Sequence, residues 1–263
     1  MIRQTLPRRM RPKLVSMLPK RLDEAALPTP FVDELLALTT NHTTGSLASG
    51  DCTVVRSPFV EDALGAVGNG TEADVDEAFR IARSAQKDWA AKPVADRVKA
   101  MEQFHKSVVK RQDLLADLVQ LETGKDRTAA FDEVLDVLNN ARYYANNAAG
   151  FLSTKRRAGA IPVITSTREQ RFPKGVVGQI SPWNYPLALG VSDAIPALLA
   201  GNAVVAKPDS TTPFSAIIAK KLLTNAGLPH DVFQIVTGSG KVVGQAIAQQ
   251  CDYLMFTGST ATG

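Results

Sequence analysis

The sequence contains few of the residues that mark metal-binding, disulfide-bonded or membrane-spanning proteins. Its 263 residues include only two cysteines, Cys52 and Cys251, which lie too far apart in the sequence for a metal-ligand pair. No apolar run reaches the roughly 18 residues that a membrane-spanning helix requires. We therefore expect no metal and no membrane partner. Because so few thiols suit a reducing compartment, we also expect a cytoplasmic location.

Acidic residues are absent from residues 1–22, which contain seven of the Lys and Arg residues. Since the whole chain has a net charge of +4, the remainder carries −3, and a mildly acidic body does not suit nucleic acid or anionic lipid. The basic segment contains Pro7, Pro12 and Pro19, which interrupt a helix, and it lacks the apolar core of a secretory signal. We interpret residues 1–50 as a basic, disordered arm together with the segment that leads into the first predicted hairpin. An organelle-targeting or surface-binding arm stays open as an alternative.

Residues 51–160 show the pattern of a hairpin followed by helices. Residues 53–68 alternate apolar and polar side chains around Ser57 and Pro58, as a β-hairpin does. Apolar residues at helical spacing then predict three helices. These run from the N-cap Thr71 to Lys92, from Ala95 to Leu121 and from Ala129 to Ala149.

Residues 161–173 change in character. The segment alternates along its length and is rich in β-branched residues, which predicts strands. Within it, TREQRF places polar and charged side chains on both faces, which favours a sheet edge or a subunit contact over a core.

Residues 174–263 alternate regularly between predicted strands and predicted helices. The strands are VVGQI, NAVVAK, DVFQIV and DYLMF, and the helix after the first strand contains Pro196, where we expect an interruption. Four strands joined by three helices predict an α/β fold with a doubly wound, Rossmann-like parallel sheet. In such sheets ligands bind beyond the carboxyl ends of the strands.

Small and polar residues follow each of the four predicted strands. The four tips read SPWN, KPDS, TGSG and TGST. They carry hydroxyls, amides, glycines and a lysine but no bulky aliphatic side chain. The sequence therefore predicts that the four tips form one ligand site.

Four segments in this order resemble the aldehyde dehydrogenase superfamily, and among its branches the NADP-type succinate-semialdehyde dehydrogenases. The segments are GVVGQISPWNYP, AGNAVVAKPDSTTP, GSGKVVG and LMFTGSTATG. The resemblance implies that residues 51–160 begin a cofactor-binding domain, that 161–173 are oligomerisation strands and that 174–263 bind a dinucleotide. It also implies an aldehyde substrate and a homo-oligomer.

The first tip raises the question of why a strand should end in an indole and a carboxamide. In the resembling family, the carboxamide equivalent to Asn184 donates to the oxyanion that forms when a thiolate attacks the aldehyde. A turn-stabilising role for Asn184 is the alternative. The resemblance places Trp183 beside the cofactor channel, whereas its residue type alone also suits a core anchor.

The second tip, Lys207, Pro208, Asp209 and Ser210, bears on the choice of cofactor. The resemblance gives Lys207 the adenine ribose or its 2′-phosphate as a partner, while a surface lysine is the alternative reading. Ser210 stands where many NAD-using relatives carry a glutamate. Because a hydroxyl does not repel a 2′-phosphate, we expect NADP, with NAD as a possible substitute. The charge of Asp209 would oppose this if it faced the phosphate.

The third and fourth tips supply glycines. The resemblance places Gly240 and Gly244 against the adenosine half of the cofactor. Gly258 and Ser259 precede a presumed helix, where backbone N–H groups and a hydroxyl suit a pyrophosphate or ribose. A plain tight-turn role for Gly258 stays open.

The resembling family also uses a nucleophilic cysteine and a general-base glutamate, and we expect both to lie beyond Gly263. Cys251 precedes the fourth strand, on the wrong side of the sheet for the site. We therefore expect an N-terminal, cofactor-binding fragment without activity of its own. Ser192 stands where some semialdehyde-oxidising relatives carry an arginine for the substrate carboxylate.

Three alternatives remain. The chain could be a non-enzymatic NADP-binding module, a pseudoenzyme. It could derive from a dehydrogenase of glutarate semialdehyde, betaine aldehyde or an aliphatic aldehyde. A complete oxidoreductase that works without a thiol is the weakest option, because no His lies at a predicted strand tip and Tyr185 is the only Tyr there.

Overall fold

The computed structural model describes residues 51–59, 63–161 and 164–263. The predicted basic arm, residues 1–50, lies outside the described residues. Within the described part of the chain, no helix is both long enough and apolar enough to cross a membrane.

A four-stranded parallel sheet forms the centre of the molecule, as predicted. Its strands are β5 (Val176–Ile180), β6 (Ala203–Lys207), β7 (Phe233–Ile235) and β8 (Tyr253–Phe256). They lie in the order β7-β6-β5-β8. The chain therefore builds outward from β5 to β7 and then crosses back to the other side of β5. That reversal makes the carboxyl ends of β5 and β8 the switch point where such sheets bind ligands.

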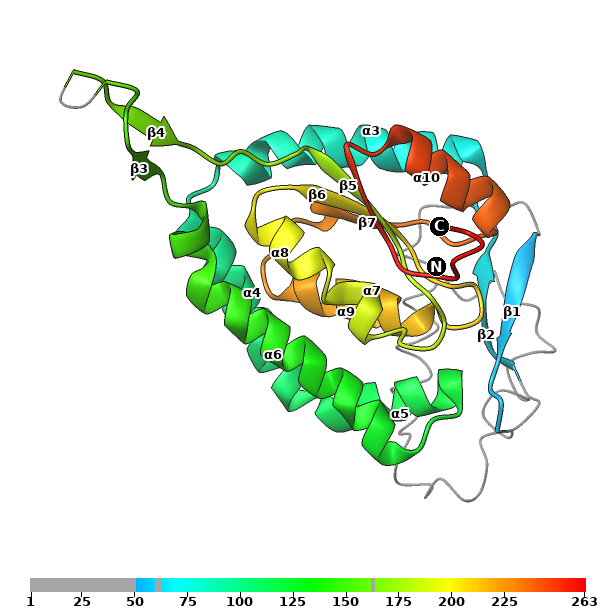
Figure 1. Cartoon of the computed structure of the whole chain (residues 1–263). Helices are drawn as coiled ribbons and strands as arrows, with labels where there is room; N and C mark the ends of the chain where they lie inside the picture. The colour runs from blue at the N-terminus through cyan, green and yellow to red at the C-terminus, as the bar shows by residue number, and fades with distance from the viewer. Residues whose placement is uncertain (1–50, 60–62, 162–163) are drawn as a thin grey trace.

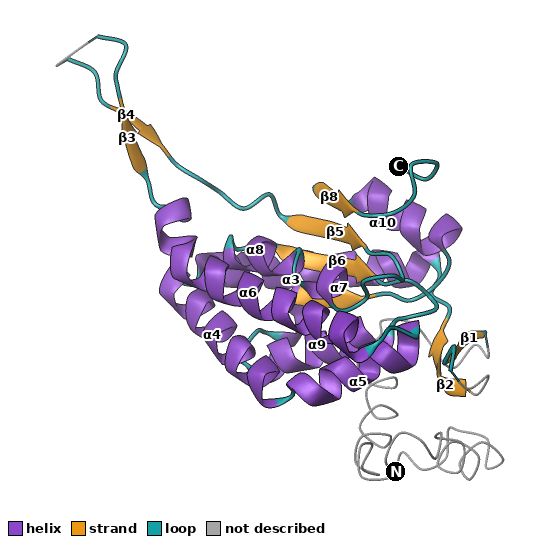
Figure 2. Cartoon of the chain, turned by 60° about the horizontal axis from the view of Figure 1, so that its bottom comes forward, coloured by secondary structure: helices purple, strands orange, loops and turns teal. Residues whose placement is uncertain are grey.

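Helices cover both faces of the sheet, which makes it doubly wound (Figures 1 and 2). One face carries α3 (Glu72–Ala91) and α10 (Gln245–Gln250), and α10 continues a five-residue π-helical turn, Gly240–Gly244. The other face carries α7 (Ala188–Val191), α8 (Ala194–Leu199) and α9 (Phe214–Asn225), beneath an outer layer. The outer layer consists of α4 (Val94–Lys110), α5 (Gln112–Thr123) and α6 (Arg127–Leu152). A short 3-10 helix, His230–Val232, precedes β7.

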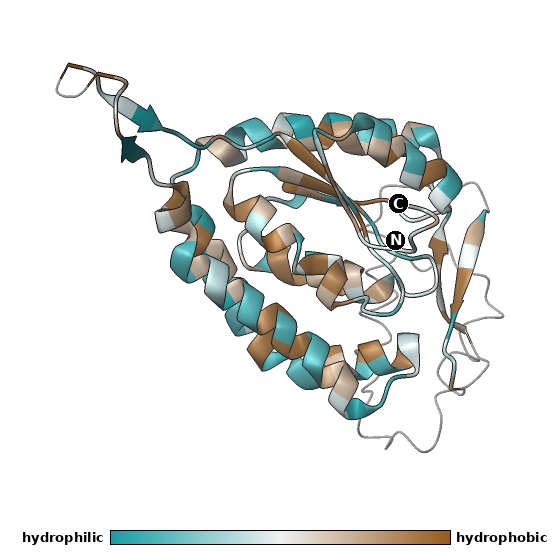
Figure 3. Ribbon diagram, in the orientation of Figure 1, coloured by the Kyte–Doolittle hydropathy of each residue, from teal (hydrophilic) through white to brown (hydrophobic). Residues whose placement is uncertain are grey.

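The central strands are buried on both faces, which explains why their sequences are continuously apolar. All five residues of β6 are buried. In Figure 3 the strands of the sheet are mostly brown, whereas teal is common on the outer helices. By contrast, β8 lies at the sheet edge, and its Tyr253 is 54% exposed.

The predicted start of the first helix is confirmed. The side chain of Thr71 accepts a hydrogen bond from the backbone N–H of Asp74, and the carboxylate of Asp74 accepts from the backbone N–H of Thr71. This reciprocal pair satisfies two N–H groups that would otherwise have no partner at the helix end.

The prediction of one helix from Ala95 to Leu121 is wrong, because the helix breaks at Arg111. That residue has φ −118° and ψ 20°, and α5 starts immediately after it. Val108 and Leu115 are both buried and lie seven residues, or two helical turns, apart. The spacing of the apolar residues is therefore the same as in one continuous helix and does not indicate the break.

The helix after β5 is interrupted as predicted, but the interruption lies before Pro196 and not at it. The chain leaves the helix at Ser192 and Asp193, and Pro196 is the third residue of α8. A proline has no N–H to bond the carbonyl four residues earlier, here that of Ser192, and its ring crowds that carbonyl. The break therefore precedes the proline, which fits within a first helical turn.

Two antiparallel hairpins complete the fold. The first pairs β1 (Cys52–Arg56) with β2 (Ala63–Gly68), as predicted. The second pairs β3 (Lys155–Arg157) with β4 (Thr167–Glu169) and projects away from the body (Figure 1). Strands were predicted throughout 161–173, but among the described residues of that segment only Thr167–Glu169 is a strand, and its partner precedes Ile161.

Candidate functional site

The carboxyl ends of the sheet strands meet at one edge and are joined by backbone hydrogen bonds. The N–H of Ser181, just after β5, donates to the carbonyl of Lys207 at 3.2 Å. On the other side, the N–H of Thr257, just after β8, donates to the carbonyl of Ile180 at 3.1 Å. The tips that carry Asn184, Lys207 and Ser259 therefore follow neighbouring strands at the same sheet edge, as the sequence predicted.

The loop after β5 presents Trp183 and Asn184 to solvent. Trp183 is 58% exposed, so the reading of this indole as a core anchor is wrong. Its backbone carbonyl accepts a 3.4 Å hydrogen bond from the hydroxyl of Thr212 in the loop after β6. Asn184 is also exposed, and its carboxamide forms no hydrogen bond within the described part of the chain. That amide is therefore available to a ligand, and the turn-stabilising alternative has no support.

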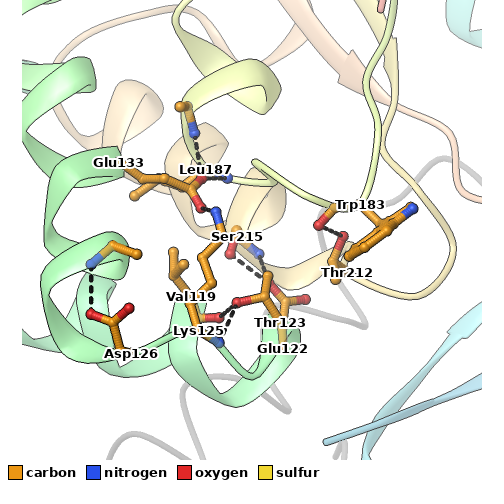
Figure 4. Close-up of polar contacts among 12 residues, drawn as sticks. Val119, Glu122, Thr123, Lys125, Asp126, Glu133, Trp183, Leu187, Thr212 and Ser215 are labelled. Atoms are coloured by element: carbon orange, nitrogen blue, oxygen red, sulfur yellow. Dashed lines mark hydrogen bonds and ion pairs between the residues drawn. The ribbon is translucent and has the colours of Figure 1, made fainter. Parts of the chain in front are cut away.

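A buried carboxylate holds the other end of this loop (Figure 4). Glu133, 1% exposed on α6, accepts hydrogen bonds from the N–H groups of Leu187 at 3.0 Å and Ala188 at 3.1 Å. These N–H groups lie at the start of α7, where a negative charge is favourable. The other oxygen of Glu133 lies 2.5 Å from Nζ of Lys125. Sequence reasoning missed both residues.

Lys207 at the end of β6 is buried, 5% exposed, and its ammonium donates to the carbonyl of Pro208 at 3.0 Å. Burial lowers the pKa of this ammonium, and the charge of Asp209 opposes that shift. A surface lysine, the alternative reading, is therefore wrong. The ammonium has hydrogen-bond donors to spare beyond the single one used by Pro208.

The two residues after Pro208 are engaged with the protein itself. The carboxylate of Asp209 accepts from the N–H and hydroxyl of Thr211, at 2.9 and 2.7 Å. The hydroxyl of Ser210 donates to the carbonyl of Gly238 at 3.0 Å, which ties the second tip to the third. The carboxylate of Asp209 thus accepts its hydrogen bonds from within the turn that contains it.

A second buried carboxylate fixes the helix that follows this tip. Glu122 at the end of α5 accepts from the N–H groups of Phe214 at 2.6 Å and Ser215 at 2.9 Å, at the start of α9. The hydroxyl of Ser215 also donates to it, at 2.5 Å. Burial raises the pKa of Glu122 to about 7, with a smaller contribution from the charge of Glu133, while the three hydrogen bonds oppose the rise.

The glycines of the third tip differ in what surrounds them. Gly238 has φ +143°, and a Cβ there would lie 2.8 Å from Val243, so this position requires glycine. A Cβ on Gly240 would meet nothing within 4 Å. On Gly244 it would come no closer than 3.8 Å, to Lys207 and Ile180. Open space therefore lies beside Gly240, and Gly244 borders the Lys207 side chain.

The fourth tip forms a turn among the described residues. The N–H groups of Thr262 and Gly263 both donate to the carbonyl of Ser259, at 3.0 and 3.1 Å. A Cβ on Gly258 would lie 2.5 Å from the ring of Phe256, which supports the tight-turn reading of this glycine. Ser259 is exposed, and its hydroxyl lies 2.9 Å from that of Thr262.

Neither cysteine belongs to the loops that follow β5, β6 and β8. Cys251 caps the end of α10 at the amino end of β8, as predicted, and its sulfur packs against Gly178 in mid-strand. Cys52 is exposed at the start of β1. Among the residues described, no three His, Cys, Asp or Glu side chains gather in a way that could hold a metal.

Ser192, the position compared with a substrate-binding arginine, is buried and engaged with an acid. Its hydroxyl donates to the carboxylate of Asp136 on α6 at 2.7 Å. Next to it, burial and then the charge of Asp136 raise the pKa of Asp193. The surroundings of Ser192 are therefore acidic.

The aldehyde dehydrogenase family profile matches residues 47–263. A protein from Mycolicibacterium smegmatis, provisionally named an NADP(+) succinate-semialdehyde dehydrogenase, is 49% identical over 237 residues, which cover 90% of this chain and 46% of that protein. A similarly named protein from Mycobacterium ulcerans is 50% identical over 205 residues, 78% of this chain and 40% of that one. The chain spans about half the length of the curated relatives it matches.

Solved structures agree with this match. An aldehyde dehydrogenase from Bacillus cereus, solved as an NAD+ complex, superposes with a TM-score of 0.78 at 31% identity, covering 88% of this chain and 49% of that one. An NADP-dependent glyceraldehyde-3-phosphate dehydrogenase from Bacillus halodurans, complexed with NADP, gives 0.76 at 30% identity, covering 82% and 46%.

The titration of Glu122 predicts a pH-dependent loss of stability. The folded chain keeps the proton of Glu122 up to about pH 7, whereas the unfolded chain releases it near 4.5. The contribution of Glu122 to the free energy of unfolding is therefore largest below about pH 4.5. It decreases by on the order of 3 kcal/mol as the pH rises to about 7. In denaturant unfolding, the free energy of unfolding of a Glu122→Gln variant should therefore rise by that amount relative to wild type over this pH range. The exposed Glu102→Gln variant is the control, and equal pH slopes for wild type and Glu122→Gln would contradict the assignment.

Proposed function

The chain belongs to the aldehyde dehydrogenase family, and from that premise we propose that it forms the cofactor-binding part of an NADP-dependent enzyme that oxidises an aldehyde to an acid. The observation that carries the proposal is the meeting of three polar tips at the switch point of the sheet. These tips follow β5, β6 and β8, and they are joined by hydrogen bonds from Ser181 to Lys207 and from Thr257 to Ile180.

The residues at this edge fit a dinucleotide. Lys207 supplies a buried ammonium with unused donors, and the space next to Gly240 is open to a phosphate-bearing ligand. In this proposal Lys207, Pro208, Asp209 and Ser210 form the adenosine end of the site. Trp183, Gly258 and Ser259 lie toward the other end. The bound dinucleotide would supply the hydride acceptor for the oxidation.

NADP is the favoured cofactor because Ser210 stands where many NAD-using relatives carry a glutamate. Ser210 is neutral, and the charge of Asp209 is held by Thr211. A 2′-phosphate would therefore meet a neutral side chain at position 210 beside the Lys207 ammonium. The M. smegmatis relative, whose name specifies NADP(+), supports the same choice. NAD remains the substitute.

Asn184 is the residue of this chain that we assign to the chemistry. When a nucleophile attacks the aldehyde carbon, the carbonyl oxygen gains negative charge and becomes a stronger acceptor. The exposed carboxamide of Asn184 donates an N–H to that oxygen, which lowers the barrier because the donor is already in place. Succinic semialdehyde is the proposed substrate of the whole enzyme, on the strength of its relatives' names.

A second candidate substrate is an aldehyde without a carboxylate, such as betaine aldehyde or an aliphatic aldehyde. The hydrogen bond from Ser192 to Asp136 favours it, because this position holds an acid and no cation to pair with a substrate carboxylate. The negative charge of Asp136 would repel the carboxylate of such a substrate.

Replacing Ser210 tests the cofactor assignment. A Ser210→Glu variant should bind NADP about tenfold more weakly than wild type, since a carboxylate would repel the 2′-phosphate. Binding of NAD should change little. Quenching of Trp183 fluorescence during titration measures both affinities, and Ser84→Glu on the exposed face of α3 controls for added charge. Failure of the wild-type chain to bind either dinucleotide would contradict the proposed function.

On their own, these 263 residues should not turn over an aldehyde. Because Cys251 lies at the amino end of β8 and Cys52 belongs to β1 and not to the loops after β5, β6 and β8, we expect no reduction of NADP with succinic semialdehyde, betaine aldehyde or propionaldehyde. Absorbance of the reduced nicotinamide follows the reaction. Steady turnover with any of them would disprove the inactivity. The preferred aldehyde would then decide between the two substrate proposals.

We further propose that the β3–β4 hairpin joins copies of the chain into a homo-oligomer. It projects from the body, and Ile164 and Phe172 beside it are 79% and 77% exposed, which is unfavourable for a free apolar surface. Sedimentation velocity should show dimers or larger species that an Ile164→Asp/Phe172→Asp variant shifts toward monomer. Phe59→Asp, at another exposed site, is the control, and a monomeric wild type would count against the proposal.

A further inference from the structure

An ion pair lies next to Leu187, at the end of the loop that begins with Trp183 and Asn184 (Figure 4). Nζ of Lys125 and Oε1 of Glu133 are 2.5 Å apart, and the side chain of Glu133 is completely buried while that of Lys125 is 18% exposed. Both residues belong to the outer helical layer, Lys125 in the turn after α5 and Glu133 on α6. Neither residue belongs to a strand tip, so the pair acts on the site only through what it touches.

Glu133 connects this pair to the backbone that follows Asn184. Its second oxygen accepts from the N–H groups of Leu187 and Ala188, three and four residues beyond Asn184. A single carboxylate therefore satisfies two otherwise unpaired N–H groups and one ammonium. If the ammonium were removed, a buried charge would be left with only the two neutral donors, which is unfavourable.

Lys125 makes the second connection, to the residue adjacent to Asn184. Its ammonium lies 3.7 Å from the centre of the Tyr185 ring, within the range of a strong cation–π contact. Tyr185 is 48% exposed, so this contact and the neighbouring backbone restrict a ring that solvent would otherwise leave mobile. The loop is therefore held at Tyr185 by the cation and at Leu187 and Ala188 by the anion.

The position of Lys125 is itself fixed by the end of α5. Gly124 ends this helix in the left-handed region, with φ +76°, which turns the chain toward the loop. The N–H of Lys125 donates to the hydroxyl of Thr123 at 3.3 Å, and its carbonyl accepts from the Gln120 amide at 3.2 Å. The ammonium thus projects from an anchored turn.

We propose that Lys125 and Glu133 are positioning residues for Asn184: together they fix the Trp183–Ala188 loop so that the carboxamide stays aimed at the carboxyl edge of the sheet. This inference rests on the proposed function, because Asn184 is useful as a donor only if a carbonyl oxygen binds there. An oxyanion donor has to be in place before the charge develops, so a loop free to reorient would lose most of its effect.

The test is hydrogen–deuterium exchange of the 263-residue chain, read at the Trp183–Val191 peptide. Lys125→Met, which keeps the stem but removes the charge, should raise exchange of this peptide by about tenfold. Lys125→Arg should stay near wild type, since a guanidinium also pairs with a carboxylate and stacks on a ring. Lys99→Met removes an exposed lysine from α4 and is the matched control, expected to match wild type.

Trp183 gives an independent spectroscopic signature. Trp89 is 1% exposed and Trp183 is 58% exposed, so emission quenched by acrylamide reports the loop alone. The anisotropy of that emission should fall in Lys125→Met and recover in Lys125→Arg. A general loss of folding would instead raise exchange in β6 and α9 as well. For that case Tyr185→Leu leaves the buried pair intact and should still lower the Trp183 anisotropy.

Titration with NADP separates this inference from the proposed function. If wild type fails to bind NADP, the proposed function fails, whatever the loop does. The inference is overturned if Lys125→Met and Tyr185→Leu both leave loop exchange and Trp183 anisotropy at wild-type values. It is also overturned if Lys125→Arg does not restore them, since a loss that a second cation cannot repair does not come from the ion pair.

Discussion

Parallel pairing of β5 with both β6 and β8 is the constraint on which the rest of the site depends. Because all three strands run the same way, the residues that follow them emerge at one edge, and the reversal of strand order at β5 makes that edge the switch point of the sheet. Ser181 and Thr257 then join those loops to the neighbouring strands. Residues more than 70 positions apart in the sequence, such as Asn184 and Ser259, thereby share one edge.

The loops need a second layer of support, since loop backbone at a sheet edge has few partners of its own. Two buried carboxylates from the outer helices supply it. Glu133 binds the start of α7, after the first tip, and Glu122 binds the start of α9, after the second. Each carboxylate lies where the N–H groups and dipole of a helix favour negative charge, which offsets part of the cost of burying it. The outer helices therefore position the site without lining it.

The strands and their tips could be predicted because buried parallel strands read as short apolar runs and the polar residues after them stand out. The roles of Lys125, Glu122 and Glu133 could not, since each depends on a partner about 50 or more residues away that no local pattern announces. Helix breaks were missed for a related reason: at Arg111 the apolar stripe stays in phase, so the local signal for a continuous helix is intact although tertiary packing ends it.

The two carboxylates also differ in a way that their surroundings explain. Glu133 has a full cation within 2.5 Å, whereas Glu122 has only neutral donors, and the nearby charge of Glu133 adds to the effect of burial on its pKa. An ammonium lowers the free energy of a buried charge more than hydrogen bonds from N–H groups do. The loop with Asn184 is therefore held by the better-compensated anion, while the support of α9 depends on the protonation of Glu122. Placing Lys125 at the first tip stabilises the part of the site where a fixed geometry matters most to the proposed chemistry.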